Sequence, residues 1–574
     1  MKNILFKFGL PLLTLLTFFI LLGNRPLNEP DEGRYSEVAR EMIETGDWLV
    51  PHFWYLPHLD KPPMTYWLVA ISMKIFGQNE WAVRLPVALA GISGVWAAFC
   101  LGSALGGRRV GLWSALILQT TMFYWFMGRM LTTDMLLTQS TAWAIYFFWR
   151  SWTALQIDKR REFFTWHLAG WIAIAFGFLA KGPAALAMPL VAFAGLLIFR
   201  RRETSGIIFA GMFAGLILFL ILAAPWFLVV FQQLPPAAHF MIFGQAAGHF
   251  LGTTIKNRSG FPGYYFLMLV WELLPWTLLL GWLWRRGHWR SLDPKSKAGW
   301  VLLNAWAIFT FVLFSLSHAK LATYILPVYP PLAIMLAWKF FGGDREYAPK
   351  IIWQIILAIP FLFLAVFPFV VFFLLHDKLP FWFVCQVPLS LAIVVLASVL
   401  ARQWQRETIA AVSAGLALLA FFTFIAEFPL FDFDFKANQP LDQIGLALRK
   451  NFQPGEAIVC WHQVPQGLPF YTGGIISATN RPYFGAMDLT KEPFIFPHNR
   501  ERLGGLYLED DAALANLLHE NRGALIVGYQ DAIEQFEKGH NDIFLRPLIH
   551  RGRWTLYSRA PADNPLSMPV LESE

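Results

Sequence analysis

The stretch NEPDEGRYSEVAREMIETGDWLVPHFWYLPHLDKPP, which runs from Asn28 to Pro63, is the polar segment around which the rest of the sequence is arranged. It follows the first hydrophobic segment, Phe8 to Leu22, and much of the remaining chain is apolar enough to span a membrane. A charged loop beside an apolar bundle suits chemistry on a charged substrate that is held in a membrane. The side of the membrane on which this stretch lies is therefore the first thing to establish.

The composition is that of a polytopic membrane protein. Of the 574 residues, 56% are hydrophobic and 15% are charged, whereas soluble domains have about 25% charged residues. The net charge of +8 comes from Lys and Arg in short clusters between apolar runs, which is a membrane-topology signal and does not indicate a nucleic-acid partner. The three cysteines, Cys100, Cys385 and Cys460, suggest neither a disulfide framework nor a metal motif.

Hydrophobic runs of roughly 20 residues can cross a bilayer, and the sequence predicts about thirteen such spans. Their predicted limits are 8–23, 84–105, 110–128, 132–149, 165–181, 184–199, 206–231, 262–284, 299–317, 321–341, 351–375, 381–401 and 408–427. The first run follows Lys2 and Lys7, as in a signal peptide, but no cleavage site follows at Gly23-Asn24-Arg25. It is therefore predicted to remain as the first span.

The distribution of positive charge predicts which loops are cytoplasmic. With the N-terminus inside, the inner loops hold most of the Lys and Arg between spans. The short outer loops hold only Arg129, Lys181, Lys256, Arg258, Lys320 and Lys378. An error of one span would mix the two sets, so their separation supports the span count. The stretch Asn28–Pro63 is predicted to face outward, which means into the periplasm if the cell is Gram-negative.

The first outward loop, 23–84, is predicted to contain interfacial helices. Asp31–Thr45 has apolar residues at helical spacing and is followed by Gly46, a pattern typical of an amphipathic helix that lies in the membrane interface. Lys61-Pro62-Pro63 breaks the chain before Met64–Phe76, which is predicted to be a second interfacial segment.

The composition changes near Asp432 and predicts a second domain. Short strands are expected at Ala457–Trp461, Ala524–Tyr529 and Trp554–Ser558, and a helix at Asp510–Glu520. The expected architecture is a polytopic α-helical membrane domain, 1–430, followed by a soluble α/β domain on the outward side, 431–574.

Two carboxylates are candidates for chemistry at the outward face. Asp31 lies in Pro-Asp-Glu-Gly-Arg-Tyr, with Arg34 one turn later, but acidic residues are also common in the first turn of a helix. Asp134 opens the fourth predicted span, where an N-cap role is the alternative. A functional role and a structural role are about equally expected for each residue.

Cationic side chains at the same face could bind a lipid phosphate. Lys61 and Lys181 each lie at a Pro- or Gly-containing turn, and Lys320 lies in the segment 318–324. A lysine acts as a point charge toward phosphate, although snorkelling to the interface is the alternative. His249, Lys256 and Arg258 lie on a long loop before the eighth span. The histidines His52, His58, His239 and His249 have no metal-binding spacing.

The first loop resembles a known family. The segments Pro-Asp-Glu-Gly-Arg-Tyr-Ser-Glu-Val-Ala-Arg-Glu-Met, Gly-Asp-Trp-Leu-Val-Pro-His and Asp-Lys-Pro-Pro are similar to those of ArnT-type aminoarabinose transferases, within the GT-C glycosyltransferases related to protein O-mannosyltransferases. Further matches are Asp134, Ala-Lys-Gly-Pro around Lys181, and Ala-Lys-Leu-Ala-Thr-Tyr-Ile-Leu-Pro at 319–327. The resemblance extends over nearly the whole chain.

This resemblance implies a function. The family takes a sugar from a polyprenyl-phosphate carrier and attaches it to an acceptor outside the inner membrane. For ArnT-type members, the donor is undecaprenyl-phosphate aminoarabinose and the acceptor is a lipid A phosphate. Asp31 would be the main catalytic carboxylate and Asp134 a second one. Arg34, Tyr35, Lys61, Lys181 and Tyr324 would line the substrate or phosphate site. Glu32, Arg258 and Lys320 are further substrate-binding candidates from their place in the sequence. The protein would act as a monomer among membrane lipids.

The chain departs from the family pattern at two places. The family's Glu-Lys-Pro is Asp60-Lys61-Pro62 here, and its His-x-x-Arg-Phe segment is Ala246-Ala247-Gly248-His249-Phe250. Both changes involve positions expected to hold a metal or the carrier phosphate. No cofactor is established by the sequence; a divalent metal with Asp60 as a ligand is left open.

The simplest expected chemistry is one displacement with inversion at the sugar. Lys61 and Lys181 would neutralise charge on the leaving phosphate, and Asp31 would orient or deprotonate the acceptor. A GT-C transferase for another sugar, or for a protein or lipopolysaccharide-core acceptor, is one alternative. A transporter of lipid-linked sugar and a non-catalytic scaffold are others, but the charges gather at one face and the halves show no repeat.

Overall fold

The computed structural model describes residues 2–199, 205–248, 260–261, 263–284, 292–342, 349–360, 405–427, 441–489, 491 and 493–559. The chain forms two compact units. We call Met1–Leu22, Val87–Leu228 and Ile242–Phe428 the helical unit, and Gly23–Pro86, Val229–Met241 and Pro429–Glu574 the mixed unit. The first polar loop therefore belongs to the same unit as the C-terminal part of the chain.

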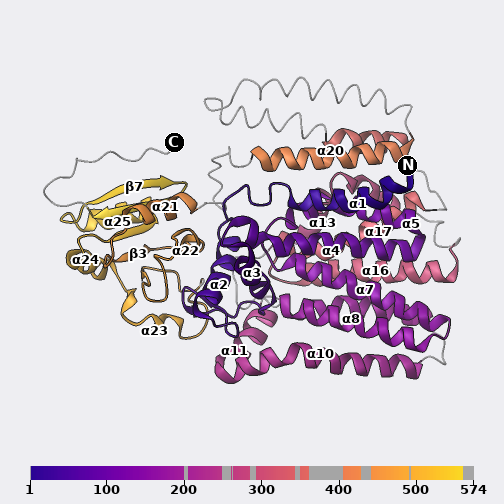
Figure 1. Cartoon of the computed structure of the whole chain (residues 1–574), viewed down its shortest axis with the longest axis horizontal. Coiled ribbons are helices and arrows are strands. Elements are labelled where there is room, and N and C mark those ends of the chain that lie inside the picture. The colour runs from indigo at the N-terminus through magenta and orange to yellow at the C-terminus, as the bar shows by residue number, and fades with distance from the viewer. Residues whose placement is uncertain are drawn as a thin grey trace. The chain divides into compact units, whose positions relative to one another are not determined.

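Long apolar helices build the helical unit (Figure 1). They are α1 (Lys2–Phe19), α4 (Glu80–Gly106), α5 (Arg108–Gln119), α6 (Met122–Met127), α7 (Asp134–Gln156), α8 (Arg160–Lys181), α9 (Ala184–Leu196), α10 (Ser205–Gln233), α13 (Tyr264–Glu272), α14 (Leu280–Leu283), α16 (Pro294–Leu316), α17 (Tyr329–Phe341) and α20 (Arg406–Glu427). Shorter helical turns are η1 (Leu197–Phe199), η5 (Trp276–Leu279) and η6 (Ala322–Val328), and α10 is followed by α11 (Pro236–His239) and the π-helix η3 (Phe240–Ala247).

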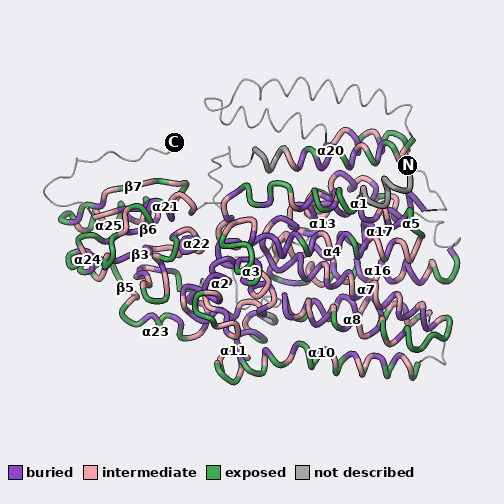
Figure 2. The backbone as a smooth tube through the Cα atoms, viewed as in Figure 1, coloured by how far each residue is buried: buried purple, intermediate pink, exposed green. Residues whose placement is uncertain are grey.

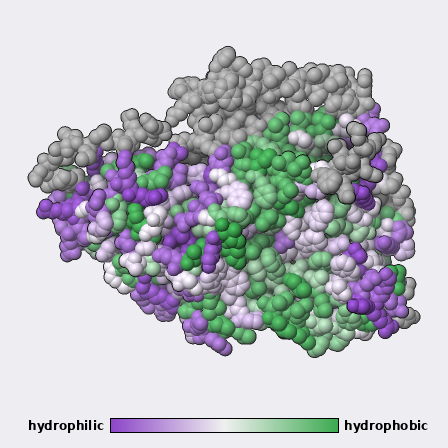
Figure 3. All heavy atoms as spheres, viewed as in Figure 1, coloured by the Kyte–Doolittle hydropathy of each residue, from purple (hydrophilic) through white to green (hydrophobic). Residues whose placement is uncertain are grey.

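The surface of this unit is suited to lipid. Among the described residues, five helices are long and apolar enough to cross a membrane, or six if the pair Tyr264–Glu272 and Trp276–Leu283, bent by 114°, is one span. Exposed and intermediate positions recur along α10 (Figure 2), where Phe209 and Ile221 are exposed. A broad hydrophobic band covers the helices on the face drawn in Figure 3. The predicted span 381–401 and most of 351–375 lie outside the described residues, so the count of thirteen stays a prediction.

One predicted span, 110–128, consists of two helices. The hydroxyl group of Thr120 donates to the carbonyl oxygen of Leu116 at 2.6 Å, and that of Thr121 donates to the carbonyl oxygen of Ile117 at 2.8 Å. Such bonds compete with the backbone hydrogen bonds of a helix. α5 ends just before these threonines and α6 begins just after them.

The C-terminal part of the mixed unit contains a six-stranded sheet with the order β5-β4-β3-β6-β8-β7. The strands β5, β4, β3 and β6 run parallel to one another, and β8 pairs antiparallel with both β6 and β7. The strands are β3 (Ile458–Trp461), β4 (Tyr483–Gly485), β5 (Tyr507–Leu508), β6 (Leu525–Tyr529), β7 (Leu545–Arg551) and β8 (Trp554–Arg559). The helices are α21 (Asp442–Asn451), α22 (Leu468–Tyr471), α23 (Asn499–Leu503), α24 (Asp511–Glu520) and α25 (Gln530–Gly539), with the short 3-10 turn η8 (Gly504–Leu506).

The core of this sheet explains its strands. Val459, Trp461 and Ile526 are buried in one cluster with apolar residues of α24 and α25, including Leu514 and Phe536. Continuous apolar strands of this kind are typical of a parallel sheet that is covered by helices. Strands and a helix lie at the four segments for which the sequence predicts them.

The first loop forms α2 (Asp31–Thr45), a two-stranded hairpin of β1 (His52–Phe53) and β2 (Leu56–Pro57), and α3 (Met64–Phe76). α2 ends because Gly46 adopts a φ of 73° and donates its N–H to the Met42 carbonyl oxygen, as glycine readily does at a helix end. Every residue from Glu32 to Met42 is buried. The amphipathic pattern predicts a polar face turned to water; instead, the protein itself covers that face and pairs its charges.

Candidate functional site

Asp31 is the first residue of α2 and keeps its carboxylate accessible. Its side chain is 42% exposed, whereas that of Arg34, one turn later, is 10% exposed. An Arg34 guanidinium nitrogen lies 2.5 Å from an Asp31 carboxylate oxygen. A carboxylate held by a buried guanidinium has a fixed position and still faces solvent, which is what a group that acts on a second molecule needs.

Asp60 and Lys61 extend this charged group. The Lys61 ammonium lies 3.1 Å from the Asp60 carboxylate. Burial by itself would raise the pKa of Asp60, but attraction to Lys61, Arg34 and His58 outweighs burial and holds that pKa below its usual range. Arg34 thus acts on both acids. Asp31, Arg34, Asp60 and Lys61, which we call the loop group, are brought together by the structure.

The side chains of Tyr35 and Glu32 are buried and make structural contacts within the protein. The ring of Tyr35 is buried and stacks on that of Tyr66, with 5.5 Å between the ring centres. The carboxylate of Glu32 is fully buried and accepts bonds from two guanidinium groups. Arg84 reaches it with two nitrogens, at 2.8 and 2.9 Å, and Arg25 with two at 2.7 and 3.1 Å.

These arginines tie α2 to its neighbours. Arg84 also donates to the carbonyl oxygens of Arg25 and Pro26, each at 2.8 Å. The backbone N–H of Asn28 donates to Glu32 at 2.9 Å. The start of α2 is therefore fixed by a charged network that excludes water, and Asp31 lies directly beside it.

Replacing Glu32 with alanine is expected to destabilise the protein strongly. The two guanidinium groups would stay buried without their counter-charge, and removal of one member of a buried ion pair costs about 3–5 kcal/mol. The measurement is the unfolding temperature of the purified protein in detergent, followed by tryptophan fluorescence. Glu162→Ala is the control because its pair with Lys159 is exposed and is worth about 1 kcal/mol or less. Equal shifts for the two variants would contradict the structural role of Glu32.

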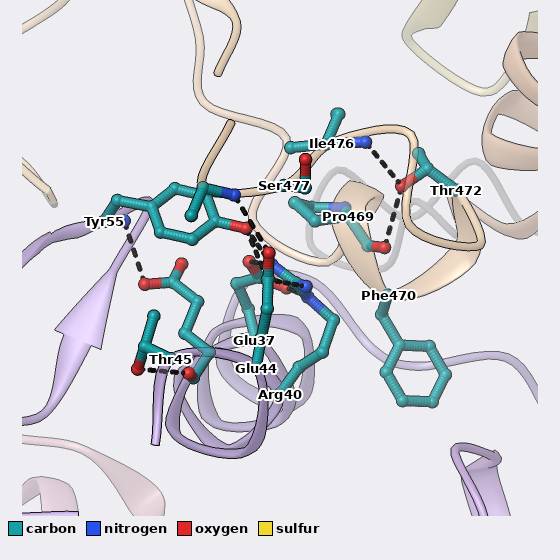
Figure 4. A network of polar contacts seen from close by, with 12 residues as sticks. Glu37, Arg40, Glu44, Thr45, Tyr55, Pro469, Phe470, Thr472, Ile476 and Ser477 are labelled. Atoms are coloured by element: carbon teal, nitrogen blue, oxygen red, sulfur yellow. Dashed lines mark hydrogen bonds and ion pairs between the residues drawn. The ribbon is translucent and has the colours of Figure 1, made fainter. Parts of the chain in front are cut away.

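The second half of α2 carries another network, drawn in Figure 4. The Arg40 guanidinium lies 2.7 Å from Glu37 and 2.6 Å from Glu44, and it also donates to the Tyr55 hydroxyl at 2.8 Å. The hydroxyl of Tyr55 donates to Glu44 at 2.7 Å. The hairpin that carries Tyr55 is thereby fastened to α2.

A second group of predicted residues lies in the helical unit. Asp134 begins α7 and Lys181 ends α8, and their side chains form an ion pair with 6% and 9% exposure. The Lys181 ammonium also lies 4.6 Å from the ring centre of Tyr324, in η6. Three elements therefore place a carboxylate, an ammonium and an aromatic ring together. We call Asp134, Lys181 and Tyr324 the bundle group.

The α7–α8 hairpin brings the bundle group together. α7 and α8 pack side by side (Figure 1) and are joined by a short connection. The start of one and the end of the other therefore lie at the same end of the bundle. A cation near a tyrosine ring gains further attraction from the ring face.

Lys320 and Arg129 bond mainly to backbone. The Lys320 ammonium donates to the carbonyl oxygens of Ser315 and Ser317, at 2.9 and 2.6 Å. The buried Arg129 guanidinium donates to the carbonyl oxygens of Thr17 and Phe18, each at 3.1 Å. Arg129 thereby caps the end of α1. Such bonds give both cations roles in holding the ends of helices.

Two residues near these groups were not predicted. The buried Tyr265 donates its hydroxyl to the Leu321 carbonyl oxygen at 3.0 Å and lies within electrostatic reach of Asp134 and Tyr324. Glu29 lies two residues before Asp31, and burial raises its pKa to about 8. The position of Glu29 in the polar stretch Asn28–Pro63 could have indicated a role for it. For Tyr265, the sequence offered only the residue type.

The part of the chain that the structure describes has no cluster of side chains that could bind a metal ion. No three His, Cys, Asp or Glu side chains are arranged there to hold an ion. The carboxylate of Asp60 faces Lys61. The residues His249 and Arg258 lie outside the described residues, so their predicted roles stay predictions, as does the metal.

Comparisons with known proteins find relatives of the kind that the first-loop motif resembles. Residues 60–228 match the family described as dolichyl-phosphate-mannose-protein mannosyltransferase. The undecaprenyl phosphate-α-4-amino-4-deoxy-L-arabinose arabinosyl transferase of Aeromonas salmonicida is 34% identical over 337 residues, which are 58% of this chain and 59% of that protein. Its counterpart from Aeromonas hydrophila is 33% identical over 341 residues, again 58% and 59%. The chain thus matches less than two thirds of the length of these relatives.

The fold is also that of a solved transferase. The crystal structure of ArnT from Cupriavidus metallidurans bound to undecaprenyl phosphate aligns with a TM-score of 0.76 at 21% identity, over 96% of this chain and 97% of that one. Its apo structure gives 0.77, at 21% identity and 97% and 98% coverage. The resemblance inferred from the sequence is confirmed: over 58% of its length the chain is similar to the arabinosyl transferases, and its fold is that of the ArnT structures.

Proposed function

We propose that this protein is a glycosyltransferase that moves a sugar from a polyprenyl-phosphate carrier to an acceptor in the periplasm. Aminoarabinose on undecaprenyl phosphate is the proposed donor, since the curated relatives are named for it. A lipid A phosphate is the proposed acceptor, as the resemblance of the first loop implies. The observation that carries the proposal is the accessible Asp31 carboxylate, held by the buried Arg34. We further propose an inner-membrane location, outward-facing chemistry and a monomer.

The proposed reaction is a single displacement. The bond between the sugar C1 and the carrier phosphate oxygen breaks, and its electron pair leaves with the polyprenyl phosphate. An oxygen of the acceptor forms the new bond to C1 from the opposite face. An acceptor phosphate is already ionised, so Asp31 acts mainly by positioning the acceptor or by stabilising positive charge on the sugar ring, and it takes a proton only from a hydroxyl acceptor.

Cationic side chains would stabilise the leaving phosphate. Lys181 and Lys61 carry fixed positive charge, held by Asp134 and Asp60 respectively. Fixed charges stabilise a developing anion without reorganisation during the reaction. Asp134 is then a positioning residue that holds the Lys181 side chain in place.

The remaining predicted residues have other proposed roles. The ring of Tyr324 lies beside the Lys181 ammonium and would line the phosphate site there. Arg34 positions Asp31, and Tyr35 supports the loop through its stack on Tyr66. We do not include Glu32 and Lys320 among the proposed substrate-binding residues. The Glu32 carboxylate forms ion pairs with two arginines, and the Lys320 ammonium donates to two backbone carbonyl oxygens.

The test in cells compares the lipid A of a strain that makes the donor but lacks its own transferase, with and without this protein. Mass spectrometry is expected to show lipid A that gains one aminoarabinose per modified phosphate only when the protein is present. If lipid A gains a different sugar, the proposed transferase activity stands and the proposed donor is wrong. Unchanged lipid A, with the protein correctly inserted and the donor detected, would contradict the proposed acceptor.

A further inference from the structure

The first loop and the C-terminal part of the chain are joined by several hydrogen bonds within the mixed unit. The backbone N–H of Leu27 donates to the Tyr471 hydroxyl at 2.8 Å. The side chain of Asn499 donates to the Pro57 carbonyl oxygen at 3.0 Å. The backbone N–H of Ala478 donates to Glu44 at 2.9 Å, and Glu44 belongs to the Arg40 network drawn in Figure 4. The loop that carries Asp31 is therefore held along much of its length.

A further contact of this kind lies next to Asp31. The backbone N–H of Gly467 donates to a carboxylate oxygen of Glu29 at 2.8 Å. The backbone of Gly467 also lies against Gly33, in the first turn of α2. A Cβ atom on Gly33 would lie 2.7 Å from the Gly467 nitrogen and 2.8 Å from its Cα, which is closer than such atoms can approach.

A side chain on Gly467 would also disturb this contact. A Cβ atom on Gly467 would lie 2.5 Å from the Glu29 carboxylate oxygen and 3.0 Å from the Gly33 Cα. Gly467 itself has a φ of −94°, which any residue can adopt. Alanine at 467 would therefore act through this contact and not through backbone strain.

We infer that Glu29 and Gly467 are positioning residues through which the C-terminal part of the chain sets the place of Asp31. Glu29 and Gly33 lie on the two sides of Asp31 in the sequence, and the Gly467 backbone touches both. A shift of the Gly467 segment would move the first turn of α2 and its carboxylate. The inference rests on the proposed function, because it gives Asp31 a task in sugar transfer.

The first test measures position without activity. Hydrogen–deuterium exchange of the purified full chain in detergent is compared for wild type, Gly467→Ala and the control Gly505→Ala, since a Cβ atom on Gly505 would meet nothing within 4 Å. Gly467→Ala is expected to raise exchange in residues 28–36 by about tenfold, with little change in the sheet. Equal exchange in the two variants would overturn the inference.

The second test measures the reaction. Glu29→Ala and Gly467→Ala are expected to lower the maximum rate of transfer about tenfold or more, because small misplacement of a reacting group is costly, while the KM for the donor changes about twofold or less. Glu29→Gln is expected to restore most of the rate, since its amide oxygen can accept the Gly467 N–H.

The outcomes separate this inference from the proposed function. If the wild type transfers sugar and Glu29→Ala or Gly467→Ala keeps its maximum rate, the positioning role is wrong although the function stands. If Glu29→Gln is as slow as Glu29→Ala, the hydrogen bond to Gly467 is not what positions Asp31, and the inference is overturned. An inactive wild type contradicts the proposed function, and the exchange measurement still decides whether the contact positions α2.

Discussion

Asp31→Asn is expected to reduce the maximum rate of sugar transfer by about 10²–10⁴-fold, the range typical of a lost acid–base or charge-stabilising group. The amide keeps the size of the side chain and can still bond to Arg34, which lies 2.5 Å away, so the fold should persist. It lacks the negative charge that would orient the acceptor or stabilise the sugar ring. The measurement is the rate of product formation by purified protein at saturating donor.

The matched control for this prediction is Asp47→Asn. Asp47 lies in the same loop, where its carboxylate accepts the backbone N–H groups of Leu49 and Val50 at 2.9 and 3.0 Å. An asparagine oxygen can accept the same bonds, so we expect near-normal activity. Protein level and donor binding should stay close to wild type in both variants. A fully active Asp31→Asn variant would remove Asp31 from the mechanism.

Lys181→Met is expected to cost both activity and stability. Loss of the ammonium removes charge stabilisation that is worth about 10²–10³-fold in rate at comparable sites. It also leaves the Asp134 carboxylate, with 6% exposure, without its counter-ion, and this should destabilise the protein by about 3–5 kcal/mol. Transfer rate and unfolding temperature, measured on the same preparation, report the two losses.

A double variant separates these two effects. Adding Asp134→Asn to Lys181→Met removes the unpaired charge, so the unfolding temperature should recover in large part. The transfer rate should stay low, because the leaving phosphate still lacks its cation. Recovery of the rate together with the stability would mean that Lys181 has a structural role only.

The sequence alone predicted many of the helices, because helix ends depend on nearby residues. The limits of α2 match the prediction, with Gly46 at its end. The pairing of Asp134 with Lys181 could have been predicted from the sequence, since consecutive antiparallel helices bring the start of one beside the end of the next. What the sequence lacked was the rotation of each helix, which decides whether two side chains face one another.

The surroundings of α2 could not be predicted for a different reason. A polar helix face shows that charges need water or partners, but it does not say which. For Glu32 the partners are Arg25 and Arg84, and for Glu29 the partner is the backbone of Gly467, more than 400 residues later. A backbone donor leaves no trace in residue type, so this contact has no signal in a single sequence.

The most direct test of the central claim uses purified wild-type protein in detergent, without any ion gradient. Undecaprenyl-phosphate aminoarabinose and lipid A are supplied, and both lipids are followed by mass spectrometry. We expect modified lipid A and free undecaprenyl phosphate to appear in equal amounts, and the Asp31→Asn protein to form neither at a comparable rate. A donor that stays intact beside unmodified lipid A, with folded wild-type protein present, would contradict the central claim.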